Sequence, residues 1–284
     1  MALCFFVSDL HGKKERYQSL FKEIDHQKPD VVFWGGDLFP QGYYCDQEHR
    51  DDFLYHFLLP ELQYRKEKLK EAFPDIYIIL GNDDLRVNEK ALVDIEKKFK
   101  IWHYIHGKKV EYGRFSFFGY SFIPPTPFVL KDWEKYDVSR YVDPGCTHPM
   151  EGTRTVNPDY DTEFSNIQKD LEELTGNQDL SNTVFLFHSP PYNTALDRAG
   201  LDGQRVDYVP LDVHVGSIAI QRFIENRQPL LTLHGHVHEA STITGKWNER
   251  IKQTHAFSGA YDGDKLALVE FSLDDLSNAR RRLI

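Results

Sequence analysis

Cysteine is scarce in this sequence, and long apolar runs are absent from it. The three cysteines, Cys4, Cys45 and Cys146, are scattered over 284 residues, which argues against a disulfide framework or a CxxC zinc site. No apolar run approaches the ~18 residues of a membrane-spanning helix. The first apolar run begins at Leu3, which leaves no room for a signal peptide. We therefore expect a protein of the reducing cytoplasm, without membrane association.

Positive charge is also in deficit. The chain has 34 Lys and Arg against 44 Asp and Glu, a formal net charge of -10. A surface that binds long nucleic acids is basic, so this class of partner is disfavoured. A small phosphorylated substrate stays compatible, because metal ions can supply positive charge. Apolar residues make up 40% of the chain, enough for one large core, and we expect a single domain over 1–284.

Five apolar runs each lead to side chains that can ligate a metal. In α/β proteins the carboxyl ends of neighbouring strands meet at one crevice, so these side chains are expected to converge. Asp9 and His11 are two positions apart, which in extended backbone would point both the same way. The runs and the residues that follow them are 3–7 with Asp9 and His11, 31–34 with Asp37, 76–80 with Asn82, 184–187 with His188, and 230–233 with His236 and His238.

Apolar spacing predicts the elements between these runs. Helical spacing is expected over 17–24, 51–73, 89–99, 164–174 and from Ser217 onward, and strands are expected over 101–105, 110–120, 256–258 and 266–271. Pro60 should kink or split the second helix, because proline lacks the backbone N–H that the helix needs. Residues 39–50 are interpreted as a loop, and the basic run 280–282 as the solvated end of a helix.

Residues 123–160 interrupt this alternation. The segment is rich in proline and aromatic residues and lies between the third and fourth ligand-bearing strands. One interpretation is an ordered, loop-rich excursion near the mouth of the site, acting as a lid or specificity element. The other is a peripheral insertion that does not contact substrate.

The convergent residues have the chemistry of a two-metal site. They comprise four imidazoles, two carboxylates and one amide, more ligands than one ion needs. Mixed nitrogen and oxygen ligands without thiolate suit Mn, Fe, Zn or Co. Two such ions about 3.5–4 Å apart lower the pKa of a bridging water, which gives a hydroxide nucleophile, and neutralise charge on a phosphoryl group.

The five blocks resemble the calcineurin-like metallophosphoesterase superfamily in kind and order. They are Asp9-x-His11, Gly36-Asp37, Gly81-Asn82, His188 and Gly235-His236-x-His238. The resemblance implies an α/β, four-layer α-β-β-α sandwich with two mixed sheets and a dinuclear centre at the strand ends. It implies that Asp9, His11 and His238 hold one ion. Asn82, His188 and His236 would then hold the other, with Asp37 bridging the two.

One residue departs from the family pattern. Members of the family usually carry histidine after the Gly-Asn pair, and that histidine helps to protonate the leaving group, whereas this chain has Asp83. A carboxylate beside two cations is ionised and donates protons poorly. Three hypotheses follow: a preference for good leaving groups, another proton donor such as His234 or a residue of 123–160, or a weakly active metal-bound scaffold.

A second resemblance bears on the substrate. The segments 188–197 and 215–239 are similar to the branch related to bacterial cyclic-nucleotide phosphodiesterases, which favours a diester. Gly216 and Ser217 at a helix start are interpreted as a cap or, alternatively, as an anion site. Candidate phosphate contacts are Arg140, Arg154, Arg198 and Arg205.

The sequence thus predicts a metal-dependent phosphodiesterase that acts on a small, nucleotide-like substrate. A phosphomonoesterase, including a protein phosphatase, is the enzyme alternative. Protein phosphatases of the family usually carry Arg soon after the Gly-Asp block, and residues 38–42 contain none. A non-catalytic interaction scaffold is the alternative from another class. The sequence does not determine the oligomeric state.

Overall fold

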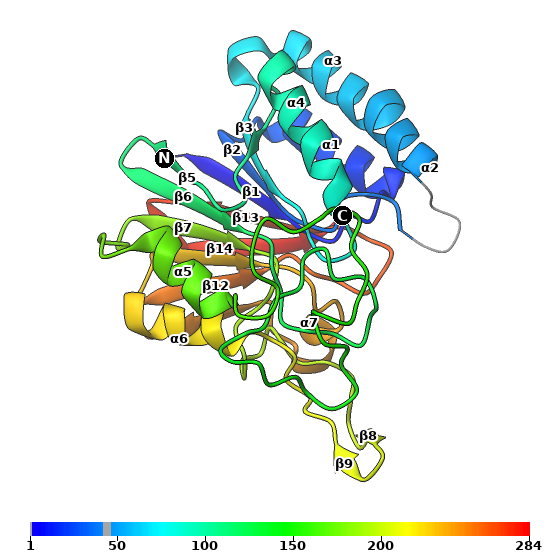
Figure 1. The fold of residues 1–284 in the computed structure, drawn as a ribbon. Coiled ribbons are helices and arrows are strands. Elements are labelled where there is room, and N and C mark those ends of the chain that lie inside the picture. Colours follow the sequence, from blue (N-terminus) through cyan, green and yellow to red (C-terminus); the bar gives the residue numbers. More distant parts are fainter. Residues whose placement is uncertain (1, 42–46) are drawn as a thin grey trace.

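The computed structural model of the protein describes residues 2–41 and 47–284 (Figure 1). The middle of the predicted 39–50 loop, with Cys45, therefore lies outside the described residues. None of the described helices has the length and hydrophobicity needed to cross a bilayer.

Two six-stranded mixed sheets form the centre of the molecule. The first has the strand order β14-β13-β1-β2-β3-β4 and the second the order β11-β12-β10-β7-β6-β5. Strands of the first sheet are β1 (Leu3–Val7), β2 (Val31–Gly35), β3 (Asp75–Ile79), β4 (His103–Tyr104), β13 (Ala267–Ser272) and β14 (Asp275–Leu283). Strands of the second are β5 (Lys109–Tyr112), β6 (Phe115–Tyr120), β7 (Thr183–Phe187), β10 (Leu231–His234), β11 (Asn248–Ile251) and β12 (Thr254–Ser258). The hairpin β8 (Arg205–Val206) and β9 (Val209–Pro210) stands apart from both.

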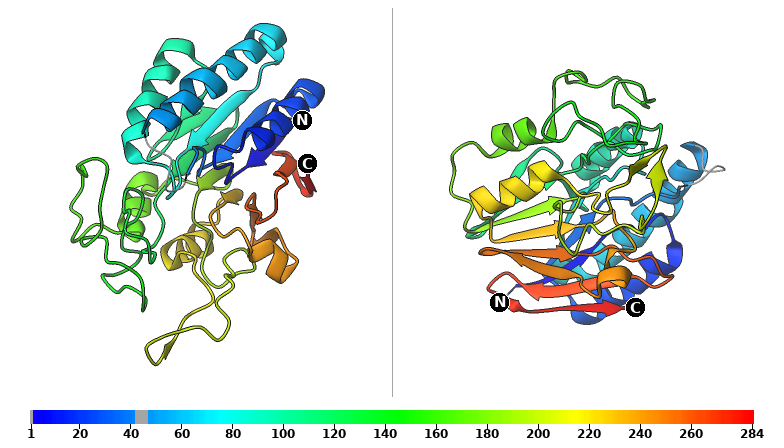
Figure 2. Two further views of the ribbon diagram at one scale, coloured as in Figure 1. Left: turned by 90° about the vertical axis from the view of Figure 1, so that its right-hand side faces the viewer. Right: turned by 90° about the horizontal axis from the view of Figure 1, so that it is seen from below.

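Helices cover the outer faces of the two sheets. The long helices beside the first sheet are α1 (Lys14–Gln27), α3 (Leu59–Leu69) and α4 (Glu89–Phe99), and those beside the second are α5 (Ile167–Thr175) and α6 (Ile218–Arg227) (Figures 1 and 2). The short elements are α2 (Gln47–Asp52), η1 (Phe53–Leu58), η2 (Lys70–Ala72), η3 (Arg86–Asn88) and α7 (Ala240–Thr244). The arrangement confirms the predicted α-β-β-α sandwich.

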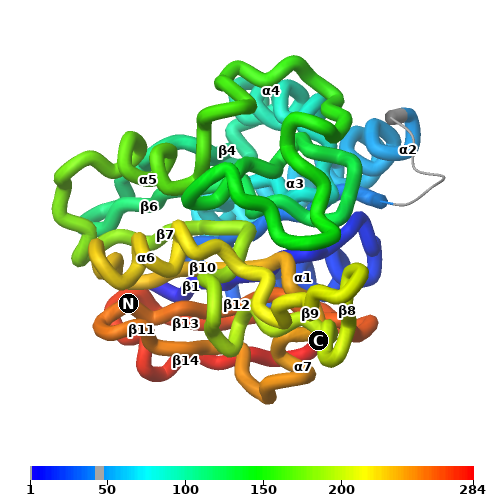
Figure 3. Tube along the Cα trace, turned by 60° about the horizontal axis from the view of Figure 1, so that its bottom comes forward, coloured from blue at the N-terminus to red at the C-terminus, as the bar shows by residue number. Residues whose placement is uncertain are grey.

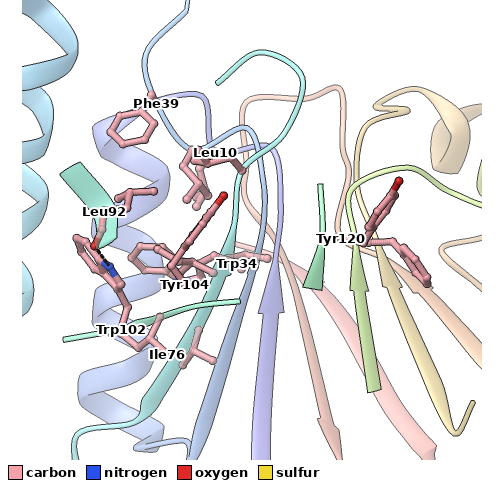
Figure 4. Packing of buried hydrophobic residues seen from close by; sticks show 14 of the residues in the cluster. Leu10, Trp34, Phe39, Ile76, Leu92, Trp102, Tyr104 and Tyr120 are labelled. Atoms are coloured by element: carbon pink, nitrogen blue, oxygen red, sulfur yellow. Dashed lines mark hydrogen bonds between the residues drawn. The ribbon is translucent and has the colours of Figure 1, made fainter. Parts of the chain in front are cut away.

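Each central strand buries both of its faces. On β1, Phe5 and Val7 pack toward the helices, whereas Cys4 and Phe6 pack between the sheets. Such strands read as unbroken apolar runs, since neither face meets water. In the outer layer, the indole N–H of Trp102 donates to the Leu92 carbonyl at 3.0 Å, which joins α4 to the sheet (Figure 4).

Pro60 alters its helix without ending it, because the chain widens to a π-helix immediately before the proline. The N–H of Leu59 donates to the carbonyl of Leu54, five residues back, and the α-helical pattern resumes as α3. The wider turn accommodates the proline ring, which would otherwise meet the carbonyl of the preceding turn.

Three predicted elements are wrong in detail. Phe164 is exposed and precedes α5, which starts at Ile167 with the Asn166 side chain as its cap. The basic run 280–282 belongs to strand β14 rather than to a helix end. The strand expected over 101–105 shrinks to His103–Tyr104. In each case the local side-chain pattern is compatible with both the predicted and the observed structure, and contacts with neighbouring elements determine which one forms.

The segment 123–160 contains no long helix or strand, and it forms the irregular green loops in Figure 3. All seven residues of 131–137 are nevertheless buried, including five that carry charge. Lys131 pairs with Glu134 in the interior of the segment. The Lys135 ammonium pairs with Asp170 of α5 at 2.6 Å.

The remaining charges of 131–137 reach other elements. Asp132 accepts the N–H of Arg86 at 2.7 Å, close to the loop after β3. Asp137 accepts the N–H of Ile218 at 2.7 Å and the Ser217 hydroxyl at the start of α6. Because opening would leave buried charges unpaired, these contacts favour 131–137 as a fixed part of the fold, and the lid and the peripheral insertion both stay interpretations for the rest of 123–160. The same contacts favour a helix cap over an anion site at Gly216 and Ser217, because the Asp137 carboxylate already occupies the N-terminus of α6.

Replacing Lys131 by Met should destabilise the protein by about 3–5 kcal/mol, because Glu134 would stay buried without its cation. Urea denaturation measures the difference. Lys90→Met, which breaks an exposed pair with Asp94, is the control and should leave the unfolding midpoint nearly unchanged. Equal effects of the two changes would contradict an anchoring role for 131–137.

Candidate metal centre

The predicted ligands meet at the carboxyl ends of β1, β2, β3, β7 and β10. Asp9, His11, Asp37 and His238 offer ligand atoms that all lie within 4.8 Å of one another. His11 Nε2 is 3.1 Å from His238 Nε2, which is itself 3.2 Å from Asp9 Oδ1. These four side chains come from three loops that are far apart in the sequence.

The other three predicted ligands lie beside this cluster, next to Asp37 and Asp9. His188 Nε2 lies 3.2 Å from Asp37 Oδ2 and 3.0 Å from Asn82 Oδ1. The ring of His236 lies 5.3 Å, centre to centre, from that of His188. The backbone N–H of His236 also donates to Asp9 Oδ1 at 3.0 Å. The structure therefore brings all seven residues together, in two groups that share Asp37.

Four of these residues adopt left-handed backbone conformations. The φ angles are 56° at Asp9, 48° at His11, 53° at Asp37 and 74° at His236. Each such residue costs on the order of 1–3 kcal/mol, and this kind of strain gathers at functional sites. The argument from extended backbone at Asp9 and His11 is thus wrong, although the two side chains do converge. They converge because the chain turns sharply after β1.

Glycines make room for the close approach of the loops. A Cβ on Gly81 would stand 2.3 Å from Asp37 Oδ1 and 2.5 Å from His188 Cε1. A Cβ on Gly235 would stand 2.8 Å from Asp9 Oδ2. The Gly-Asn and Gly-His pairs of the sequence are therefore steric requirements of this site.

Asp84 is a positioning residue to which the sequence interpretation gave no role. Its buried carboxylate accepts the N–H groups of Leu38, Phe39 and Gly81, at 2.9–3.0 Å. It thereby joins the loop that carries Asp37 to the loop that carries Asn82. In the sequence, the only indication of this role was that Asp84 is a second carboxylate, directly after Asp83.

The donor set fits divalent cations. His11 Nε2 and Asp9 Oδ1 lie 3.1 and 3.2 Å from the same atom, His238 Nε2, so a single N–H at His238 would have to serve both acceptors. Buried His11 Nδ1 has no hydrogen-bond partner. A cation satisfies several lone pairs at once, and mixed nitrogen and oxygen donors suit first-row divalent metals.

Comparison with known families settles the membership. The family model described as calcineurin-like phosphoesterase matches residues 4–240. The chain belongs to the calcineurin-like phosphoesterase family. The possible metal-ligand cluster lies where the motifs of this family meet.

Individual relatives are distant from this phosphoesterase. MJ1162 of Methanocaldococcus jannaschii is 37% identical over 68 residues, which span 23% of this chain and 28% of that protein. The crystal structure of TT1561 of Thermus thermophilus aligns with a TM-score of 0.55 at 16% identity, over 99% and 98% of the two chains. A dimetal phosphatase from Danio rerio aligns with a TM-score of 0.52 at 12% identity, over 95% and 91%. The two structures support the fold alone.

The charged side chains of the centre shift one another's pKa values. Burial alone would lower the pKa of His188, but the Asp37 carboxylate beside it raises that pKa to about 10. Burial also opposes protonation of His238, and its bond to Asp9 raises the pKa to about 9. Both imidazoles thus carry the proton that a metal ion would replace.

Asp83 faces the same cluster. Its N–H donates to Asp37 Oδ1 at 2.8 Å, and its Oδ1 accepts from the Asn82 amide at 3.0 Å. Burial and then the negative charge of Asp37 raise the pKa of Asp83 to about 7 without metal. Cations at the site would lower this pKa again, as the sequence interpretation assumed.

His234 does not face the centre. Its Nδ1 bonds to the Ser189 carbonyl at 2.9 Å and its Nε2 to the Thr232 hydroxyl at 2.8 Å. The ring is fully buried and stacks on Phe187, and burial lowers its pKa to about 4. The structure therefore does not support His234 as the proton donor, because both of its ring nitrogens are hydrogen-bonded away from the centre.

The candidate arginines make no contact with the seven residues. Arg140 pairs with Glu163, Arg154 donates to the Pro149 carbonyl, and Arg198 pairs with Asp202. Arg205 lies in the β8–β9 hairpin. A role in substrate binding stays a prediction for all four.

Gly81→Ala should remove tight binding of two metal ions, because its Cβ would collide with Asp37 and His188. Isothermal titration with Mn²⁺ measures the stoichiometry and the affinities. Gly200→Ala is the control, since the nearest atom to its Cβ would be 3.9 Å away. Two ions bound by Gly81→Ala with unchanged affinities would contradict the proposed packing.

Proposed function

We propose that this phosphoesterase hydrolyses a small, nucleotide-like phosphodiester with the aid of two divalent metal ions. The observation that carries the proposal is the shared position of Asp37, between the Asp9–His11–His238 group and the Asn82–His188 pair. A carboxylate between two sets of nitrogen and oxygen donors is the arrangement that a dinuclear centre requires.

Each group of side chains would hold one ion. Asp9, His11 and His238 suit the first and Asn82, His188 and His236 the second, with Asp37 common to both. The donor set is compatible with Mn, Fe, Zn or Co. Such ions supply Lewis acidity toward phosphoryl oxygens and water when bound. The small number of cysteines further supports a cytoplasmic location.

Asp83 supports a diester over a monoester. Its side chain is 33% exposed and lies 3.8 Å from the His11 ring, so it borders the space open to substrate. An ionised carboxylate there repels a dianionic monoester more than a monoanionic diester. The same carboxylate cannot protonate a leaving group, so a substrate whose leaving group departs as a stable anion is favoured.

The loop after β2 gives no support to a protein phosphatase. The N–H groups of Leu38 and Phe39 both donate to Asp84, and no arginine follows Asp37 within residues 38–42. Asp83 and this loop together make a small diester the favoured substrate class.

The test compares two substrates on metal-stripped protein to which Mn²⁺ is returned. Metal-dependent turnover should be faster on bis-p-nitrophenyl phosphate than on p-nitrophenyl phosphate. Asp37→Asn should abolish turnover of both, because it removes the shared carboxylate charge. Faster turnover of the monoester would overturn the diester assignment, and turnover that does not need metal would overturn the proposal.

Two changes at Asp83 separate its charge from its inability to donate a proton. Asp83→His introduces an imidazolium that can protonate an alkoxide leaving group, so rates on alkyl diesters should rise about 100-fold or more relative to aryl diesters. Asp83→Asn is the control, which removes the charge alone. It should raise the monoester rate relative to the diester rate and leave the alkyl-to-aryl ratio unchanged. An unchanged ratio in Asp83→His would contradict the leaving-group argument.

A further inference from the structure

Arg16 of α1 is a buried cation directly behind the Asp9 loop. Its side chain donates from Nη1 to the Asp9 carbonyl at 2.6 Å, from Nη2 to the Gly263 carbonyl and from Nε to the Asp264 carbonyl at 3.4 Å. The residue is only 5% exposed. All three donating nitrogens therefore bind main-chain oxygens.

The guanidinium has no ion-pair partner among residues 2–41 and 47–284. No carboxylate oxygen lies within 4.0 Å of its nitrogens in that part of the chain. A buried cation without a paired carboxylate is costly unless its hydrogen bonds are needed where they are. One of these bonds is made to Asp9, whose φ is 56°. Arg16 Nη1 thus binds the carbonyl of a residue whose backbone is in a strained conformation.

The loop that Arg16 reaches is also tied to the strand that leads to His238. The N–H of Gly259 donates to the His234 carbonyl at 2.9 Å. The hydroxyl of Thr242, on α7 just after His238, donates to Asp262 at 2.8 Å. Arg16 thus links the two segments that carry Asp9 and His238, which lie more than 200 residues apart in the sequence.

The other half of the centre has a different brace. Asp84 joins the loops of Asp37 and Asn82 through three backbone N–H groups. Within residues 2–41 and 47–284, Arg16 forms no hydrogen bond or ion pair with these two loops, and Asp84 forms none with Asp9 or His238. Each half is therefore braced by its own side chain, although backbone bonds such as that from the His11 N–H to the Asp37 carbonyl at 2.7 Å also join the loops.

We propose that Arg16 is a positioning residue for one ion of the pair, setting the affinity of the ion bound by Asp9, His11 and His238 more strongly than that of the other ion. The inference rests on the proposed two-ion centre. Residues behind metal ligands change metal affinity by about 10–100-fold when they are replaced. The specific expectation is that this loss falls mainly on one ion, since Arg16 bonds to the Asp9 carbonyl and reaches the second ion's ligands only indirectly.

Titration of metal-stripped full-length protein with Mn²⁺ tests the inference without reference to activity. Arg16→Gln should weaken one ion about 10–100-fold and change the affinity of the other much less. Arg16→Lys keeps the charge and reaches fewer carbonyls, so its loss should be smaller. Urea denaturation of each variant confirms that it is folded under the titration conditions.

Arg227 provides a matched control. Its guanidinium also donates to main-chain carbonyls, those of Gly176 and Gln178, but it ends α6 shortly before β10 begins, so it lies at the end of the strands opposite the ligands. Arg227→Gln should bind two ions with parental affinities, even if it is as destabilised as Arg16→Gln. Equal loss of metal in the two variants would overturn the inference.

A second background shows which ion is affected. Asn82→Ala should lower the affinity for the ion of the Asn82–His188–His236 group. Adding Arg16→Gln should then lower the affinity for the remaining ion. If Asn82→Ala with Arg16→Gln binds that ion as tightly as Asn82→Ala alone, the inference fails while the two-ion centre stands. A parent protein that binds fewer than two ions would instead overturn the proposed function.

Discussion

The contacts of the Asp37 carboxylate are the constraint on which the rest of the site depends. One oxygen lies 3.2 Å from His188 and the other accepts the N–H of Asp83 at 2.8 Å. These contacts require Asp37 in a left-handed conformation and no side chain at Gly81. Two loops from different strands can approach this closely because the adjacent parallel strands β2 and β3 end together.

The site also concentrates negative charge in a protein that already carries a net charge of -10. Asp9, Asp37, Asp83 and Asp84 all lie in or beside it, and the first, second and fourth are fully or almost fully buried. Backbone N–H groups donate to Asp84, Asp9 and Asp37, and neighbouring imidazoles further stabilise the ionised forms of Asp9 and Asp37. Divalent cations are the natural replacement for the protons of these imidazoles, and a diester adds less negative charge than a monoester.

Prediction from the sequence was accurate wherever a single periodic signal determined an element. Helix α4 occupies the predicted residues 89–99, and β1 the predicted residues 3–7, because their apolar patterns match one burial geometry. It failed at Phe164 and at 280–282, where the same residues suit a helix or an extended chain. It also left 123–160 open, since nothing local shows that 131–137 is buried by partners as distant as Ile218.

The sequence alone determined the seven candidate ligands, because they follow from the residue types after the apolar runs, and the two-sheet fold was implied by the family resemblance that these motifs carry. Only the tertiary structure decided where side chains point and what lies behind them. His234 turns toward Ser189 and Thr232, Asp9 reaches the cluster through a left-handed turn, and Arg16 and Asp84 brace separate halves. Those features depend on contacts between residues distant in the chain, which local pattern does not encode.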